Sequence, residues 1–388
     1  MTITAPHGFR ASGVKAGIKA SGNPDLALVV NDGPLKAAAA VFTSNRVAAA
    51  PVHWSRQVVS DGRVDAVVLN SGGANACTGP QGFQNTHATA EKVASVLGIS
   101  ASDVVVCSTG LIGEQMPMDK LLPGVDAAAA ELSDDGGLAA ATAIMTTDTV
   151  AKQAVFIGED ADGTVFTVGG IAKGAGMLAP GLATMLVVLT TDAEVEAELL
   201  DVVLRDAARI TFDRTDSDGC MSTNDTVVLL ASGASGAVPS AEALGEGVTH
   251  VCAELARKLI GDAEGASHDI AIRTFNAASE KDAEVVSRAV ARSNLFKAAV
   301  FGNDPNWGRV LSAVGTTDAV FEPDQLAVSM NGVQICRDGG IGEDRSLVDL
   351  KPREVIVEID LKAGEAEATI WTNDLTHDYV HENSAYSS

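Results

Sequence analysis

A series of short apolar runs, each bounded by turn residues, constrains the fold of this chain more than any other feature. The runs lie at 25–30, 38–43, 65–70, 103–108, 185–191, 226–232, 269–275, 297–301, 325–330, 355–360 and 367–372. Such runs are typical of buried β-strands. Helices are expected at 87–97, 123–133, 191–206, 240–260 and 279–296, the third of them because Thr191 and Glu194 have capping-box spacing. Strands and helices that mix without strict alternation predict an α/β fold with α+β-like layers.

The composition narrows the class of protein further. Hydrophobic residues make up 46% of the 388 residues and aromatic residues only 4%, so we expect a globular core of small aliphatic side chains. The formal net charge of −24 would repel phosphate backbones, and nucleic acid is therefore not an expected partner. The acidic, glycine-containing stretch 131–137 is the expected linker.

Cysteine usage and hydropathy indicate a cytoplasmic protein. The five cysteines are scattered and include no C-x-x-C pair, which fits reduced thiols better than a disulfide framework. The N-terminal residues lack the basic region and apolar run of a signal peptide. No stretch approaches the roughly 18 uninterrupted apolar residues of a membrane span, so no membrane association is expected.

The most informative stretch is 173–192, KGAGMLAPGLATMLVVLTTD, where a loop rich in Gly and Pro ends at Thr184 and an apolar run begins at Met185. Its first half matches a loose G-x-G-x-x-A dinucleotide fingerprint. We disfavour that interpretation because Pro180 stands where the phosphate-binding helix should run, and because a strand rather than a helix follows.

The same stretch also has the features of a self-cleaving segment. A threonine hydroxyl is a weak nucleophile and needs a base. If the peptide bond between Ala183 and Thr184 breaks, the new α-amine lies beside its own hydroxyl, and with a pKa of about 7.7–8.0 it can accept the proton. A Gly/Pro loop permits the strained geometry that cleavage requires. Taken by itself, however, the local sequence fits an ordinary threonine between loop and strand better.

An ordered series of motifs resembles the ornithine acetyltransferase family, the glutamate N-acetyltransferases of arginine biosynthesis. KGAGMLAP followed by LATML is similar to the family's cleavage site, which lies between Ala and Thr. The other similar motifs are ITAPHGFRASGVKAGIK (3–19), NSGGANACTG (70–79), CSTGLIGEQMPMDK (107–120), IMTTDT (144–149), STNDTV (222–227), DPNWGR (304–309) and TNDLTHDYVHENSAYSS (372–388). Several long motifs in the right order, spread over nearly the whole chain, make this resemblance specific.

The resemblance implies roles for individual residues. Thr184 would be the nucleophile, freed by cleavage after Ala183, and the backbone N–H groups of Thr109 and Gly110, expected in a polar turn after a buried strand, would form the oxyanion hole. The implied substrate contacts are Thr147, Lys173, Thr184, Glu264, Asn383 and Ser388. We interpret Lys173 as an isolated loop cation suited to a substrate carboxylate, and Glu264 as a loop residue after a helix that ends near residue 260.

The implied reaction moves an acetyl group from N2-acetylornithine to L-glutamate in two ping-pong steps, through acetyl-Thr184, in the cyclic pathway of arginine biosynthesis. One amide is exchanged for another, so no cofactor is expected. Whether acetyl-CoA is a second acetyl donor stays open. The resemblance also implies a self-processing fold of the N-terminal-nucleophile type, with an α chain of residues 1–183, a β chain of residues 184–388, and an assembly of two α and two β chains.

Three departures from the family pattern stand out. Gly73 replaces the usual Asn, and GCMSTND at 219–225 is atypical in its first residues. DAEGASH at 262–268 replaces the more usual DGEGATK, so that His268 stands where a Lys is usual. None of these touches the nucleophile or the oxyanion pair, but His268 changes the charge expected near Glu264 and so bears on substrate affinity.

Other catalytic machinery has little support in the sequence. There is no G-x-S-x-G elbow and no P-loop. No metal site is expected, because His377 and His381 are four residues apart in a stretch whose pattern predicts strand or turn. Two alternatives stay open: a self-processing aminopeptidase or amidohydrolase of the same fold, in which water is the acceptor, and a non-catalytic acidic binding protein that would stay uncut.

Overall fold

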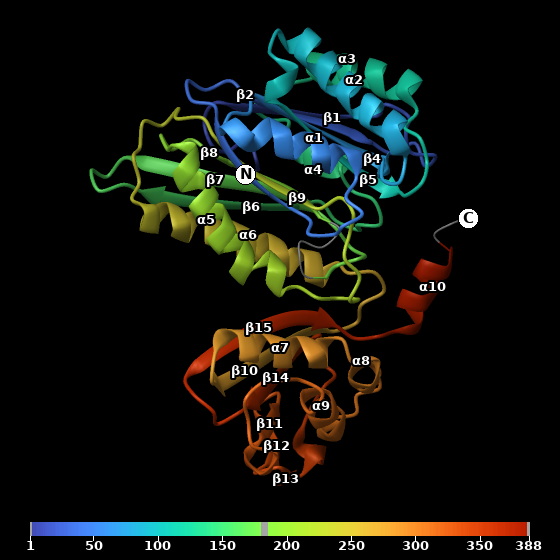
Figure 1. Ribbon diagram of the computed structural model, residues 1–388, viewed down its shortest axis with the longest axis vertical. Coiled ribbons are helices and arrows are strands. Elements are labelled where there is room, and N and C mark those ends of the chain that lie inside the picture. The colour runs from blue at the N-terminus through green and yellow to red at the C-terminus, as the bar shows by residue number, and fades with distance from the viewer. Residues whose placement is uncertain (1, 180–184, 386–388) are drawn as a thin grey trace. The chain divides into compact units, whose positions relative to one another are not determined.

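A computed structural model describes residues 2–179 and 185–385, which form two compact units (Figure 1). Unit 1 comprises the described residues of 2–177, 185–213 and 220–259, and unit 2 those of 178–179, 214–219 and 260–385. The expected linker at 131–137 is wrong. That stretch lies within unit 1, where Ser133 and Ala11 exchange two backbone hydrogen bonds of 2.9 and 3.0 Å.

Unit 1 contains two β-sheets. The first has the order β1 (Phe9–Val14), β2 (Leu26–Asn31), β4 (Ala66–Gly73), β5 (Val104–Leu111). The second has the order β3 (Ala37–Phe42), β9 (Thr226–Ala231), β8 (Leu186–Thr191), β7 (Val165–Lys173), β6 (Lys152–Glu159). The pairs β4–β5 and β8–β9 are parallel, and the other neighbours are antiparallel.

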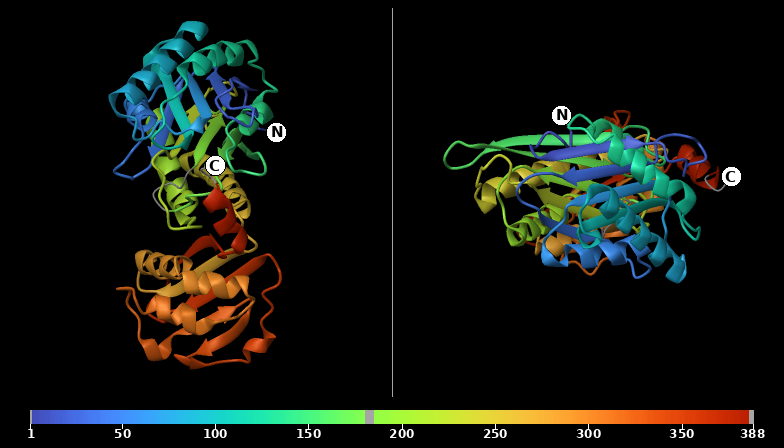
Figure 2. Two further views of the ribbon diagram at one scale, coloured as in Figure 1. Left: turned by 90° about the vertical axis from the view of Figure 1, so that its right-hand side faces the viewer. Right: turned by 90° about the horizontal axis from the view of Figure 1, so that it is seen from above.

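The side chains of the first sheet alternate between two cores. Leu26 and Leu28 pack with residues of α2 (Gly79–Leu97) and α3 (Met118–Ala130), whereas Val29 packs with Val188 of the second sheet. Two helices, α5 (Ala197–Ile210) and α6 (Ala241–Gly261), cover the second sheet, and α1 (Ala50–Val58) and α4 (Gly137–Ala143) complete the unit (Figure 1 and Figure 2). Unit 1 therefore has four layers in the order helix, sheet, sheet, helix. Successive side chains of a strand point to opposite faces of the sheet, so each sheet packs helices on one face and the other sheet on the other.

Unit 2 has one sheet of its own. Its strand order is β13 (Gly340–Ile341), β12 (Val333–Arg337), β11 (Ala327–Met330), β14 (Glu354–Asp360), β10 (Asp269–Ala277), β15 (Ala366–Asn373). The helices of the unit are α7 (Glu280–Ala291), α8 (Asn294–Phe301), α9 (Trp307–Val314) and α10 (His377–Ala385). A hydrophobic core fills the space between the sheet and α7, α8 and α9. Short 3-10 helices lie at Val59–Asp61, Ala101–Asp103, Phe212–Arg214, Pro323–Gln325 and Arg345–Leu347.

The predicted α/β fold is confirmed, and ten of the eleven predicted strands are present to within a few residues. The run 297–301 is instead the second half of α8, which starts where the Ser293 side chain accepts the backbone N–H of Phe296. A short apolar run does not distinguish a buried strand from a buried helix. The helix expected from 191 starts at Ala197, because Thr191 is the last residue of β8. None of the helices described here has the length and apolarity needed to cross a bilayer.

Candidate active site

A cluster of buried charges lies at the end of β7 in unit 1. Lys173, the last residue of β7, and Lys152, the first of β6, are 1% and 0% exposed. Asp148 lies between α4 and β6, and its Oδ1 accepts Lys152 Nζ at 2.6 Å and the Gly174 backbone N–H at 2.6 Å. Its Oδ2 accepts the Thr146 N–H at 2.9 Å and lies 3.9 Å from Lys173 Nζ. The interpretation of Lys173 as an isolated loop cation is therefore wrong.

The two ammonium groups determine the ionisation of Asp148. Burial alone would raise the pKa of this carboxyl, but Lys173 and Lys152 outweigh burial and hold its pKa at about 2. Asp148 is therefore a carboxylate at neutral pH. Thr147, a predicted substrate contact, is half-buried and lies between Asp148 and Thr146, both of which this network holds.

Thr109 and Gly110 lie within β5 and not in a turn after it, which corrects the expectation from the sequence. Lys173 Nζ donates to Thr109 Oγ1 at 3.4 Å, so the structure brings these two predicted residues together. Gly110 has φ of +133°, and the pairing of β4 with β5 shifts register at Gly73, opposite Thr109. Consecutive N–H groups of a regular strand point to opposite sides, and a bulge with a left-handed glycine breaks that alternation. Such a backbone is suited to aiming both N–H groups at one oxygen.

Three glycines meet at this bulge. A Cβ built on Gly110 would lie 2.5 Å from the backbone nitrogen of Gly73 and 2.6 Å from the carbonyl carbon of Gly72, closer than real Cβ contacts. At Gly73 itself, a Cβ would lie 2.8 Å from Met116 Sδ, the far part of a flexible side chain. The glycine that departs from the family pattern therefore leaves room for Met116 beside Gly110.

The STNDTV motif supplies two buried residues that the sequence analysis did not single out. The Asn224 side-chain amide donates to the carbonyl oxygens of Ala74, at 2.6 Å, and Ser108, at 2.8 Å, directly before Thr109. Asp225 Oδ1 accepts the backbone N–H of Met185 at 3.0 Å. Burial raises the pKa of Asp225 well above its ordinary value, although the Met185 N–H and Lys173 oppose this. The resemblance of the STNDTV motif pointed to this segment, but the sequence did not show which residues Asn224 and Asp225 contact.

Met185 is the described neighbour of the predicted nucleophile. Ala183, Thr184 and Ser388 lie outside the described residues. Since Met185 precedes β8 and its N–H is bound by Asp225, the chain is held firmly from residue 185 onward.

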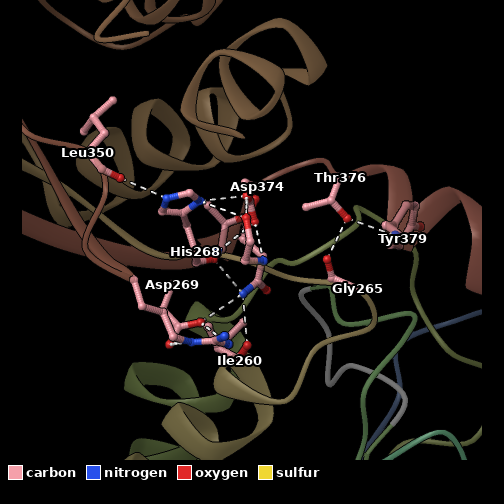
Figure 3. Close-up of polar contacts among 12 residues, drawn as sticks. Ile260, Gly265, His268, Asp269, Leu350, Asp374, Thr376 and Tyr379 are labelled. Carbon is pink, nitrogen blue, oxygen red and sulfur yellow. Dashed lines mark hydrogen bonds and ion pairs between the residues drawn. The ribbon is translucent and has the colours of Figure 1, made fainter. Parts of the chain in front are cut away.

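The structure brings together the two predicted residues of unit 2 that it describes. Asn383, on α10, donates through Nδ2 to Glu264 Oε2 at 3.0 Å. Glu264 follows α6, as expected. Nearby, Thr376 Oγ1 donates to the Gly265 carbonyl at 2.6 Å and accepts the Tyr379 N–H at 2.9 Å (Figure 3). The expectation of strand or turn at His377 and His381 is wrong, because both lie on α10.

A cavity of about 420 Å³ within unit 2 is lined by Glu264, Asp218, Asp374, Lys297 and Tyr379, among other residues. Lys297, which the sequence analysis did not single out, is 5% exposed, and Nζ donates to the Ser217 carbonyl oxygen and, at 3.3 Å, to Thr372 Oγ1. Burial lowers the pKa of Lys297. A pocket lined by both signs of charge is suited to a small molecule that carries an ammonium and a carboxylate.

Within residues 2–179 and 185–385, no three His, Cys, Asp or Glu side chains are grouped so that they could hold a metal ion. All five cysteines lie among the described residues and none is in a disulfide, and three of them are buried.

Comparisons with known proteins agree on one family. A sequence model of the ArgJ family matches residues 10–388. The arginine biosynthesis bifunctional protein ArgJ of Streptomyces coelicolor is 66% identical over 388 residues, which is all of both chains, and that of Thermobifida fusca is 62% identical over the same length. A chain in the crystal structure of ornithine acetyltransferase from Mycobacterium tuberculosis complexed with ornithine is 56% identical in sequence to this chain. The match covers 48% of this chain and 96% of that chain, with a TM-score of 0.43.

Proposed function

This chain belongs to the ArgJ family, and on that premise we propose that it is a glutamate N-acetyltransferase that moves an acetyl group from N2-acetylornithine to L-glutamate. The reaction yields ornithine and N-acetylglutamate and serves arginine biosynthesis in the cytoplasm. The single observation that carries the proposal is 66% identity over the full length of a relative named as an arginine biosynthesis bifunctional protein. The buried cluster at Thr109 and Lys173 supports it.

The first step is cleavage between Ala183 and Thr184. β7 ends at Lys173 and β8 begins at Leu186, and these two residues are paired neighbours in the same sheet. A cut between these strands leaves the products, of 183 and 205 residues (388 − 183), joined by the hydrogen bonds of the sheet. The freed Thr184 then has an α-amine beside its hydroxyl, which supplies the base that this chemistry needs.

The second step is attack of Thr184 Oγ1 on the acetyl carbonyl of acetylornithine, while the α-amine takes the hydroxyl proton. The oxyanion forms against the N–H groups of Thr109 and Gly110, near the ammonium of Lys173. The C–N bond breaks, the ornithine amine takes the proton, and acetyl-Thr184 is left. The α-amine of glutamate then attacks this ester and regenerates the hydroxyl. Both donor and product are amides, so the transfer needs no cofactor.

Intact mass spectrometry of the purified protein, before and after acetylornithine is added, tests processing and covalent catalysis together. We expect two fragments that start at Met1 and Thr184, with one acetyl mass added only to the second, and native mass spectrometry should give two copies of each. Thr184→Ala should remain a single chain and take up no acetyl group. An unmodified full-length mass for the wild-type protein would contradict the proposal.

Dependence on the acceptor separates transfer from hydrolysis. We expect ornithine release in continuous turnover only when glutamate is present. If acetylornithine is consumed equally fast without glutamate, the protein is a hydrolase of the same type and the transferase assignment fails. Replacing acetylornithine with acetyl-CoA in the same assay measures whether a second acetyl donor is used.

A further inference from the structure

Asn224 and Asp225 are consecutive buried residues of unit 1 whose side chains bind two different β-sheets. They directly precede β9, and they are 4% and 0% exposed. The Asn224 side chain contacts β5 of the first sheet, and the Asp225 side chain contacts the residue before β8 of the second sheet. Two adjacent residues therefore join the strand that carries the proposed oxyanion hole to the strand that follows the proposed nucleophile.

The Asn224 amide group holds the peptide group that carries the Thr109 N–H. The Ser108 carbonyl, which accepts from Asn224 Nδ2 at 2.8 Å, belongs to the same planar peptide group as the Thr109 N–H. Nδ2 also donates to the Ala74 carbonyl at 2.6 Å, and Oδ1 accepts the Thr223 hydroxyl at 2.5 Å. Both N–H bonds of the amide and its oxygen are engaged, so the group is held against rotation. The direction of one proposed oxyanion donor therefore depends on Asn224.

Asp225 holds the peptide group that joins Thr184 to Met185. The Met185 carbonyl accepts the Thr226 N–H at 3.2 Å and so takes part in the sheet. The strand pairs of β8 begin only at Leu186, and the Met185 N–H is instead accepted by Asp225 Oδ1 at 3.0 Å. Both polar groups of the Met185 backbone are thereby bound, one residue after the proposed nucleophile.

Stability alone does not account for a carboxyl group at position 225. Within the described residues, Asp225 Oδ2 has no hydrogen-bond partner, although the side chain is completely buried. Burial raises the pKa of this carboxyl well above its ordinary value. A buried oxygen without a partner lowers the stability of the folded state. Asp225 thus makes a specific contact with Met185 while lowering stability, which is typical of residues that serve function.

We propose that Asn224 and Asp225 form a clamp, a pair of positioning residues that aligns the nucleophile with the oxyanion hole. Each acts through a peptide group of the chain, beside Thr109 or beside Thr184, rather than on the substrate. Because the two residues are adjacent, the backbone between them limits how far these two peptide groups can move apart. The clamp rests on the proposed function for the roles of Thr184, Thr109 and Gly110.

The kinetic test removes the two contacts of the clamp singly and together. A misplacement of about 1 Å can slow a reaction about 10²-fold, so Asn224→Leu and Asp225→Leu should each lower kcat by about this factor, with a smaller change in KM. The double variant should be no slower than the slower single variant, because residues that act as a unit have non-additive effects. Two independent roles would instead multiply to about 10⁴-fold.

Two matched controls remove buried hydrogen bonds of the same two sheets outside the clamp. In Ser55→Ala, the hydrogen bond from Ser55 Oγ to the Val106 carbonyl of β5, 2.8 Å long, is lost. In Thr190→Val, the hydrogen bond from Thr190 Oγ1 of β8 to the Ile3 carbonyl, 2.6 Å long, is lost. Both side chains are 0% exposed. We expect both controls to keep the wild-type kcat, even where urea unfolding shows that they are less stable.

Rescue and processing provide two further readouts. Asp225→Asn keeps a side-chain oxygen that can accept the Met185 N–H, and it should recover most of the kcat that Asp225→Leu loses. Rates are expressed per processed chain, because Thr184 must first be freed. A leucine variant that stays uncut while Ser55→Ala and Thr190→Val are cut has lost the alignment at the cleavage step and supports the clamp. Leucine variants with the kcat of the controls, or a double variant slowed by the product of the two single effects, would overturn it.

A second measurement needs no activity. In protein labelled with ¹⁵N-methionine, the amide signal of Met185 is assigned by its loss in Met185→Leu, a substitution of similar size. We expect hydrogen exchange of this amide to be slow at neutral pH, because the N–H is buried and bound by Asp225. Fast exchange would contradict the clamp even if the acetyl transfer is as proposed. Slow exchange in a protein without transferase activity would instead count against the proposed function alone.

Discussion

The two units hold their polar groups in different ways. In unit 1, Asp148, Lys152 and Lys173 are almost fully buried, and both lysines lie at strand ends of a sheet that is covered on both faces. In unit 2, Glu264 is half-buried and Asn383 is exposed, and a loop and a terminal helix carry them. Moving a buried charge disrupts the core, whereas a loop and a terminal helix shift at lower cost. If the proposed roles hold, the chemistry lies on the rigid cluster of unit 1 and the substrate contacts of unit 2 lie on elements that can adjust.

The largest effect should follow from breaking the unit 1 cluster. Asp148→Asn removes the carboxylate that both Lys152 and Lys173 contact while both ammonium groups stay buried. We expect the free energy of unfolding to fall by about 3–5 kcal/mol, measured by urea unfolding, and acetyl transfer to be lost. The matched control, Asp162→Asn in the exposed turn between β6 and β7, should change neither. Equal stability of the two variants would show that the cluster does not hold unit 1 together.

The backbone of the proposed oxyanion hole should come next. Gly110→Ala places a Cβ against Gly73 at a φ of +133°. We expect kcat to fall about 10²–10³-fold, as when one oxyanion donor is lost. Gly98→Ala is the control, because Gly98 also has a positive φ, at the end of α2, but no atom within 4 Å of the added Cβ. A similar fall in kcat for both would mean that backbone strain, and not the position of Gly110, reduces activity.

A smaller effect is expected in acid. The pKa of Asp148 is about 2 in the folded protein, below its ordinary value of 3.8. A carboxyl whose pKa is lower in the folded state contributes stability above the unfolded pKa, and that contribution is lost as the pH falls through the folded pKa. The gap corresponds to about 2 kcal/mol. Urea unfolding between about pH 5 and about pH 2 should show the wild type losing this much more stability than Asp148→Asn, and parallel pH profiles would contradict the assignment.

The smallest effect should come from loosening unit 2. Gly265 has φ of +62°, and a Cβ there would lie 2.2 Å from the Tyr379 backbone nitrogen. Gly265→Ala should therefore displace the start of α10 and raise KM about tenfold, equivalent to about 1.4 kcal/mol, while kcat changes less. Gly332→Ala, in unit 2 with positive φ and open space, is the control. If kcat falls as steeply as in Gly110→Ala, the two units do not divide chemistry from binding in this way.

The sequence predicted most of the strands, because a buried strand is a short run of apolar residues and such a run is visible in the local sequence. It missed β1, β6, β7, β12 and β13, in which glycine or polar residues interrupt the apolar pattern. It also placed Lys173 in a loop for the same reason. The resemblance of the motifs identified the candidate site residues. It did not identify Asp148, Asn224 and Asp225, which the structure places in contact with that site. Their partners lie 25 to 150 positions away along the chain, and contacts over such separations leave no local pattern in the sequence.

The sequence by itself determined the family, the α/β class and the candidate nucleophile, because these depend on the order and identity of residues along the chain. Only the tertiary structure decided which charges meet. It paired Lys173 with Asp148 and Thr109, Asn383 with Glu264, and His268 with Asp374. The physical reason is that electrostatic and hydrogen-bond energies depend on distances of a few ångströms between side chains and on their burial, and neither quantity is written in the spacing of residues along the chain.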